Sequence, residues 1–196
     1  MKRLYIAMIV MTASCACHQT IPENWKLPAS VQGEKCPDIS GRYMDLGESI
    51  DRKSLVHVYM QSHWFFGEYE KYSVPPGKWM EIRQILIRQE EANQLEIVAL
   101  SASGTIEGRR ILKKESGDFS CQDGWIKITG SVTFGTTGSI GYANYIRSFS
   151  KTDGYLIEKE EYNSLGLILI IPIPGSGTRW YRFSHVEGRG DEALVH

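Results

Sequence analysis

Hydrophobic and polar residues alternate with a period of two along much of this chain. The clearest stretch is residues 124–134, where Ile126, Ile128, Val132 and Phe134 share one face. Lysine, serine and threonine occupy most of the other face. Such alternation is typical of a β-strand covered on one side only, so we predict a strand here whose apolar face lies toward a core.

Similar alternation recurs in seven further stretches, and each is predicted to form a strand. They are residues 55–60, 80–88, 95–100, 109–113, 139–150, 155–162 and 179–186. Turn-forming pairs such as Asp123-Gly124 and Asp153-Gly154 separate them, and no stretch keeps a helical period beyond two turns. The pattern predicts an all-β fold, an antiparallel meander of about 8–10 strands that forms a barrel or a sandwich, with a lipocalin-like barrel as one form.

Bulky side chains are expected to fill the interior of this domain, among them Ile140, Tyr142 and Ile146. The most apolar stretch is LGLILIIPIPG at residues 165–175. It is too short for a membrane-spanning helix, and its two prolines would end a helix. We expect a strand that is buried on both faces and ends at a proline edge. The alternative is a loop that touches a membrane.

The first residues have the layout of a secretory signal peptide, with a short cationic head, an uncharged run and then small residues. The run is too short for a transmembrane helix, which needs about 20 residues. Residues 12–15, TASC, resemble the lipobox of bacterial lipoproteins, in which the cysteine receives diacylglycerol. The resemblance implies lipid attachment at Cys15, with Cys17 as the alternative. A cleaved signal without lipid is the remaining interpretation.

The lipobox resemblance also implies a location for the protein. Stable anchoring takes two or more acyl chains, which the mature terminus of a lipoprotein supplies. In such proteins an aspartate after the modified cysteine favours the inner membrane, whereas Ala16 or His18 follows here. The resemblance therefore implies the periplasmic face of the outer membrane, with the N-terminal lipid as the contact to the membrane.

Composition and periodicity divide the chain into four parts. They are a signal peptide at 1–14 (1–16 if Cys17 is the anchor), a lipid anchor and flexible tether at 15–35, a single β-domain at 36–186, and a disordered tail at 187–196. Within the tether, Trp25 and Leu27 could instead dock on the domain or on a lipid surface.

Two further cysteines, Cys36 and Cys121, lie in the predicted domain. Exported chains meet oxidising conditions, so we expect a disulfide between them, worth roughly 4 to 5 kcal/mol in the chain-entropy model. A redox or metal pair would need the closer spacing of such sites. The stretch CPDISGRYMDLG at residues 36–47 is similar to uncharacterised envelope lipoproteins of Proteobacteria, a resemblance that implies no activity.

Composition and motifs give little support for nucleic-acid binding or for catalysis. The chain has 22 Lys and Arg against 23 Asp and Glu, without the basic excess that nucleic-acid binding needs. Nucleophile-elbow, zinc-helix, P-loop and dinucleotide motifs are missing, and His57 and His63 would lie about 20 Å apart along a strand. The acidic run at residues 158–161 is expected to be a solvated strand face, and the Arg-Gly-Asp tripeptide at 189–191 a chance match. We therefore predict no catalytic residue, metal or cofactor.

One cluster of aromatic residues points to binding. The stretch HWFFGEYEKY carries a predicted binding lip of five aromatic residues, namely Trp64, Phe65, Phe66, Tyr69 and Tyr72. Consecutive aromatic side chains in a strand cannot all face one core, so at least one should lie toward solvent or a partner. The alternative is a bulge that folds these rings onto the mouth of the barrel.

These observations leave three functions in order of preference. The first is a non-enzymatic envelope lipoprotein that binds an envelope protein or a cell-wall component. The second is a lipocalin-like carrier of a small apolar ligand, which would need an unfilled interior. The third is a hydrolase of unknown type, which would need a cleft of convergent ionisable groups.

Overall fold

The computed structural model of the chain describes residues 15–18, 20–27, 33, 35–51, 54–60, 64, 78–90, 92–136, 139–168 and 171–187. This part contains one short 3₁₀ helix, η1 (Lys78–Glu81). Its strands are β1 (Cys15–His18), β2 (Gly41–Met44), β3 (Leu46–Asp51), β4 (Ser54–Tyr59), β5 (Ile82–Glu90), β6 (Gln94–Ser101), β7 (Ile106–Lys113), β8 (Ser120–Gln122), β9 (Trp125–Thr136), β10 (Ser139–Thr152), β11 (Tyr155–Ile168) and β12 (Ile171–Ser184). The predicted all-β class is confirmed, with more strands than expected.

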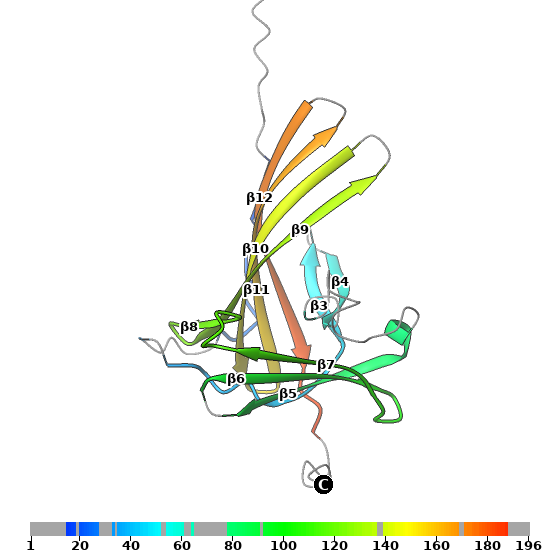
Figure 1. Ribbon diagram of the computed structural model, residues 1–196, viewed down its shortest axis with the longest axis vertical. Helices are drawn as coiled ribbons and strands as arrows, with labels where there is room; N and C mark the ends of the chain where they lie inside the picture. Colours follow the sequence, from blue (N-terminus) through cyan, green and yellow to red (C-terminus); the bar gives the residue numbers. More distant parts are fainter. Residues whose placement is uncertain are drawn as a thin grey trace, which may run out of the picture.

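The strands form two sheets that face each other (Figure 1). The large sheet has the order β4-β3-β12-β11-β10-β9-β8, and the small sheet has the order β2-β5-β6-β7. Neighbouring strands are antiparallel except that β1 lies parallel to β12. The described strands do not close into a barrel, so the arrangement is that of a sandwich.

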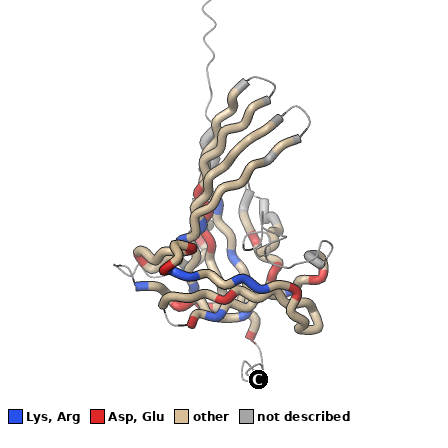
Figure 2. The backbone as a smooth tube through the Cα atoms, in the orientation of Figure 1, with Lys and Arg blue, Asp and Glu red and all other residues tan. Residues whose placement is uncertain are grey.

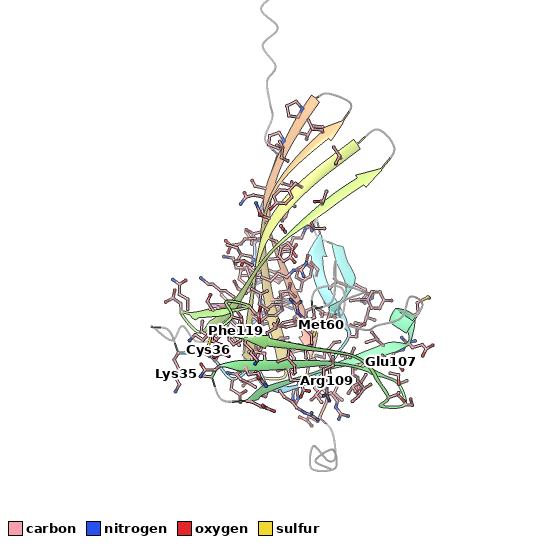
Figure 3. All side chains as sticks on the ribbon, in the orientation of Figure 1. Lys35, Cys36, Met60, Glu107, Arg109 and Phe119 are labelled. Carbon is pink, nitrogen blue, oxygen red and sulfur yellow. A yellow bond between two sulfur atoms is a disulfide. The ribbon has the colours of Figure 1, made fainter. Side chains whose placement is uncertain are left out.

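The hydrophobic core lies between the two sheets, where the side chains of the body are crowded in Figure 3. Ile126 and Ile128 of β9 are 0% and 8% exposed, which confirms the face predicted for them. From elsewhere in the chain, Met60 and Trp64 are buried in the same core, and the Trp64 ring stacks on Phe149 with centroids 4.4 Å apart. The period of two in the sequence thus predicted correctly which face of β9 lies toward the core.

The chain passes from the small sheet to the large one within a single residue, Asp45, between β2 and β3. At the start of β3, Phe183 of β12 lies so close to Gly47 that an added Cβ would be 2.2 Å from its ring. Only glycine fits this crossing. Both strands are short and were missed by the sequence pattern, because few alternating positions fall between the turns.

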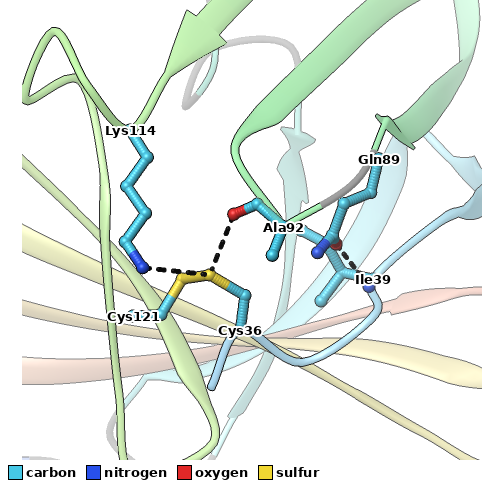
Figure 4. Close-up of a disulfide and its surroundings, with 6 residues drawn as sticks. All are labelled: Cys36, Ile39, Gln89, Ala92, Lys114 and Cys121. Atoms are coloured by element: carbon cyan, nitrogen blue, oxygen red, sulfur yellow. Dashed lines mark hydrogen bonds between the residues drawn. A yellow bond between two sulfur atoms is a disulfide. The ribbon is translucent and has the colours of Figure 1, made fainter. Parts of the chain in front are cut away.

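The predicted disulfide is present and joins the segment before β2 to β8, with the Cα atoms of Cys36 and Cys121 4.9 Å apart (Figure 4). The carbonyl oxygen of Ala92 lies 3.3 Å from Cys36 Sγ, a contact rather than a hydrogen bond because a disulfide sulfur carries no proton. Lys114 Nζ lies 3.9 Å from the same sulfur. The disulfide thus ties the small sheet's first strand to one edge of the large sheet.

Strands β9 to β12 are longer than the body and continue beyond it as a projection (Figure 1). We call this projection the fin, and it comprises residues 129–136, 139–146, 162–168 and 171–178. Two expectations are wrong here. Ile140, Tyr142 and Ile146 are 41–57% exposed rather than inside. Residues 165–168 and 171–175 belong to two paired strands, and Leu165, Leu167 and Ile173 among them are 39–52% exposed rather than buried on both faces. The reason is strand parity: Phe149 of β10 pairs with Ile126 in the core, so Ile140, Tyr142 and Ile146 lie on the opposite face of β10, turned away from the small sheet. Leu165 and Leu167 pair with Tyr142 and Ile140 on that same outer face.

Candidate functional site

The fin consists of two hairpins that end at the same level. Ser139 pairs with both Thr136 and Ile168, and Ile168 pairs with Ile171. The β9–β10 hairpin and the β11–β12 hairpin therefore continue one four-stranded sheet up to a common tip. A sheet of this length without a second layer exposes both of its faces, so its side chains should reveal what it contacts.

The fin is free of charge. Residues 128–146 and 162–178 contain no Asp, Glu, Lys, Arg or His, although 23% of the whole chain is charged. Figure 2 shows the same division, with blue and red charged residues in the body and the described strands of the fin in tan. Surfaces of soluble domains usually mix charges of both signs, so the fin differs in composition from an ordinary exposed surface.

Exposed apolar side chains gather at the tip of the fin. Their exposed fractions range from 39% to 57%, and they are Ile140, Tyr142, Leu165, Leu167 and Ile173. The cross-strand pairs Tyr142–Leu165 and Ile140–Leu167 place four of them side by side on one face. Contiguous apolar surface of this kind marks a site of interaction.

The two edges of the fin differ. On β12, Pro172 and Pro174 lie at the tip, and the next positions, Gly175 to Thr178, pair with β1. Prolines and an added strand are common ways to block an edge. On β9, the described strands pair with only one edge of residues 128–136. The fin therefore has one blocked edge and one edge along which no described strand pairs.

A buried ion network holds the base of the fin. Arg147 Nε donates to Glu160 Oε2 at 2.9 Å and lies 3.7 Å from Glu158 Oε1. Arg179 Nη1 donates to Glu160 Oε1 at 3.5 Å. Glu158 is 0% exposed and Glu160 is 6% exposed, so the expectation of a solvated acidic face is wrong for these two residues. Only Lys159 and Glu161, which alternate with them, lie on the outer face.

The electrostatics of the network follow from its burial. Burial lowers the pKa of Arg147, but the carboxylates of Glu158 and Glu160 outweigh this effect and raise that pKa above its ordinary value. Burial, followed by the Glu160 carboxylate, raises the pKa of the Tyr181 hydroxyl. The arginine stays charged and the tyrosine stays neutral. Paired carboxylates of this kind are suited to fixing the base of the fin rather than to transferring protons.

Aromatic rings complete the base. The Arg147 guanidinium lies over the Tyr145 ring at 4.3 Å, and that of Arg179 lies over Tyr162 at 4.6 Å. The Tyr145 hydroxyl would be 2.3 Å from a Cβ at Gly130, so glycine makes room for this ring. A pocket of about 270 Å³ remains, lined by Val132, Ala143, Tyr145, Glu160, Tyr162, Ser164 and Arg179.

A larger and more apolar pocket lies in the body, at the junction of β2, β3, β4 and η1. Its volume is about 510 Å³, and its lining residues are Met44, Asp45, Leu46, Tyr59, Met80, Ile82 and Arg83. The described residues contain no group of three His, Cys, Asp or Glu side chains that could hold a metal ion. No helix in that same part of the chain is long and apolar enough to cross a membrane.

The predicted site residues fall in three places. Cys15 and Cys17 lie on β1, opposite Gly175 and Gly177 of the fin. Trp64 is 1% exposed and stacks in the core, so its assignment to an exposed binding lip is wrong. The other four lip residues, Phe65, Phe66, Tyr69 and Tyr72, lie outside the described residues, as does the Arg-Gly-Asp tripeptide.

The segment at residues 20–27 contacts the large sheet, where we expected a flexible tether. Trp25 is 6% exposed and stacks on Arg182, whose guanidinium lies 4.9 Å from the Trp25 ring and 5.0 Å from that of Tyr155. Arg182 Nε also donates to Glu48 at 2.6 Å. Leu27, two residues further on, is 50% exposed.

Comparisons with known proteins add no relative. No protein-family model, characterised protein or solved structure matches the chain.

The fin itself was missed by the sequence prediction, although the sequence holds its signal. Each of the charge-free stretches 128–146 and 162–178 covers the adjoining ends of two strands, and their shared lack of charge would have indicated a part of the sheet that differs from the charged body.

Proposed function

We propose that this protein is a non-enzymatic, lipid-anchored protein of the cell envelope and that the fin is the element with which it binds an envelope component. The observation that carries the proposal is the fin itself, a projection without charge whose tip exposes five large apolar side chains. An enzyme or a carrier would concentrate its distinctive residues in a cleft. Here they lie on a projection.

The proposed anchor is Cys15, with Cys17 as the alternative, on the periplasmic face of the outer membrane. The support is the TASC sequence after an apolar run and the disulfide between Cys36 and Cys121, which suits an oxidising compartment. Metabolic labelling with an alkyne-bearing fatty acid tests the anchor. We expect the Cys15→Ser variant to lose the label and the Cys17→Ser variant to keep it. Absence of label in the parent protein would contradict lipid anchoring, and label that survives in the double variant would contradict attachment at either cysteine.

A second candidate function is the carriage of a small apolar ligand. The observation in its favour is the apolar pocket of about 510 Å³ in the body, which Tyr59 lines with 52% of its surface exposed. This pocket contains no residue of the fin, since its lining comes from β2 to β5 and η1 and Tyr59 lies on β4, two strands from β12. The two functions therefore predict different binding residues.

A pair of tyrosines distinguishes them. Tyr142 on the fin and Tyr59 in the pocket are 46% and 52% exposed, and each can be replaced in cells by the photo-crosslinking residue p-benzoylphenylalanine. Adducts at position 142 but not at 59 are expected if the fin is the binding element. Adducts at position 59 with a small molecule, together with none at 142, would establish the carrier and contradict the proposal.

A further inference from the structure

We infer that the tip of the fin inserts into the surface of the lipid bilayer that holds the N-terminal anchor. The inference rests on the proposed function and names the partner of the same site. Its evidence comes from three features that occur together: the position of β1, the absence of charge, and the level at which the exposed apolar side chains begin.

Strand β1 places the proposed anchor beside the tip. Cys15 lies opposite Gly175, which pairs with Ser164, which in turn pairs with Ala143. The five exposed apolar residues of the tip all lie between this level and the turns. Only four residue steps, about 13 Å, separate Gly175 from the start of β12 at Ile171. Acyl chains on Cys15 would therefore enter the bilayer at the depth where the apolar tip begins.

The charges begin on the other side of this level. Arg179, the first charged residue of β12 below the tip, lies four steps or about 13 Å beyond Gly175 in the opposite direction. Charged side chains within a bilayer are costly, whereas tyrosines favour its interface. Tyr142 lies one position on the tip side of Ala143 and is 46% exposed. The sequence of apolar tip, tyrosine and charged base matches the order of layers across one face of a bilayer.

The open edge of β9 limits the depth of insertion. No described strand pairs with the outer edge of residues 128–136, so backbone groups on this edge would lose hydrogen bonds to water in the hydrocarbon core. The tip can therefore enter the interfacial region and the upper part of the acyl chains, as amphipathic elements do, but it does not span the bilayer. With the lipid anchor, the fin gives the protein two contacts with one membrane and a fixed orientation.

Membrane insertion of an uncharged tip differs from electrostatic binding in how it depends on lipid charge and on salt. Binding by charged patches depends on anionic lipid and weakens with salt. Insertion of this tip should be equal in vesicles of neutral phosphatidylcholine and in vesicles that contain anionic phosphatidylglycerol, and it should not change with salt.

The fin provides a matched pair of sites for the test. Ile140 and Ile146 lie on β10 at 57% and 41% exposure, each three residues or about 10 Å from Ala143, on opposite sides of the anchor level. The full-length lipidated protein, with p-benzoylphenylalanine at one of these positions, is reconstituted into phosphatidylcholine vesicles and irradiated. Ile111 of β7, which is 49% exposed in the body, is the distant control.

We expect phospholipid adducts, identified by mass, at position 140 in at least five-fold excess over positions 146 and 111. Equal yields at 140 and 146, or no lipid adduct at 140, would overturn the inference. Formation of the Cys36–Cys121 disulfide, read from mobility without reductant, confirms that each variant is folded. A second variant, Leu167→Lys, should reduce lipid adducts at position 140 several-fold because it places a charge at the tip, and an unchanged yield would also overturn the inference.

The same sites separate this inference from the proposed function. If position 140 in cells gives adducts with a protein and none with lipid, the fin remains the binding element but its partner is not the bilayer, and the inference fails alone. If positions 140 and 142 give no adduct of any kind, both fail.

Discussion

Arg147 is the residue on which the base of the fin depends. It neutralises Glu158 and Glu160, which are almost completely buried. Removing one partner of a buried ion pair leaves an uncompensated charge and costs about 3–5 kcal/mol. We therefore expect Arg147→Met to lower the free energy of unfolding by that amount, measured by urea denaturation at neutral pH.

The matched control for this variant is Lys159→Met. Lys159 pairs with Glu161 at 2.9 Å on the outer face of β11, the strand that carries Glu158 and Glu160, and both side chains are partly exposed. An exposed pair contributes less than about 1 kcal/mol. If both variants lowered the unfolding free energy equally, the inner network would not have the structural role that its burial indicates.

Tyr181 gives the base of the fin a dependence on pH. Burial and the Glu160 carboxylate raise the pKa of its hydroxyl in the folded protein, so the folded state keeps a proton that the unfolded state releases above about pH 10. The stability is thus fully present below pH 10 and falls at higher pH, by up to about 1.4 kcal/mol per pH unit for one tyrosine. The Tyr181→Phe variant should show a shallower fall between pH 9 and pH 11 in urea denaturation.

The exposed Tyr142 provides the control for loss of a hydroxyl in that series, as Tyr142→Phe. A fall of the same slope in the parent protein and in Tyr181→Phe would show that ionisation of this buried tyrosine does not limit stability at high pH.

At the residue scale, the burial predicted from the sequence was correct only on the face of the large sheet that packs against the small sheet. The alternation predicted Ile126 and Ile128 correctly, but it also placed Ile140 in the core. Ile140 lies on the face of β10 opposite to Phe149, and only the pairing of Phe149 with Ile126 shows which of the two faces meets the small sheet. Glu158 was misjudged for a similar reason, because its arginine partner lies 11 positions away on a neighbouring strand and no local pattern reports it.

Among the elements, the long strands were predictable and the connections between sheets were not. Strands β5, β6, β9 and β10 were predicted within a few residues, because each alternates over many positions. β2 and β3 are separated by Asp45 alone and were missed. A change of sheet after one residue depends on contacts such as that between Gly47 and Phe183, which link positions far apart in the sequence.

The element that connects both sheets covalently is the disulfide. Cys36 precedes β2 of the small sheet, and Cys121 lies on β8 of the large sheet. Loss of a native disulfide from a small exported domain costs about 2–5 kcal/mol. The free energy of unfolding of the double variant Cys36→Ala/Cys121→Ala should therefore be lower by that amount, which would appear as a lower urea midpoint. An unchanged midpoint in the double variant, relative to the oxidised parent, would show that packing alone holds the two sheets together.

At the scale of the whole molecule, the sequence predicted a globular domain at the end of a tether, whereas the structure has a projection that runs alongside the proposed anchor. The all-β class could be predicted from local alternation, and the anchor was proposed from the local TASC motif. The fin required knowledge of where the second sheet ends, which depends on the full set of strand pairings. Strand β1 and Trp25 both contact the large sheet, so the N-terminal segment follows the domain instead of separating it from the membrane.

These contacts predict how far the body stands from the bilayer. If a flexible tether set this distance, an insertion of about 30 Gly and Ser residues after Leu27 would increase it by about 14 Å, by the square-root rule for coils. If the fin and β1 set this distance, the insertion should leave it unchanged, because the tip and the body are connected through strands β9 to β12 and not through the segment after Leu27. Energy transfer from a fluorophore at position 111 to a labelled lipid in phosphatidylcholine vesicles measures the distance. An unchanged efficiency is expected, and a fall equivalent to the coil extension would show that the protein hangs from its tether and that the fin does not hold it at the membrane.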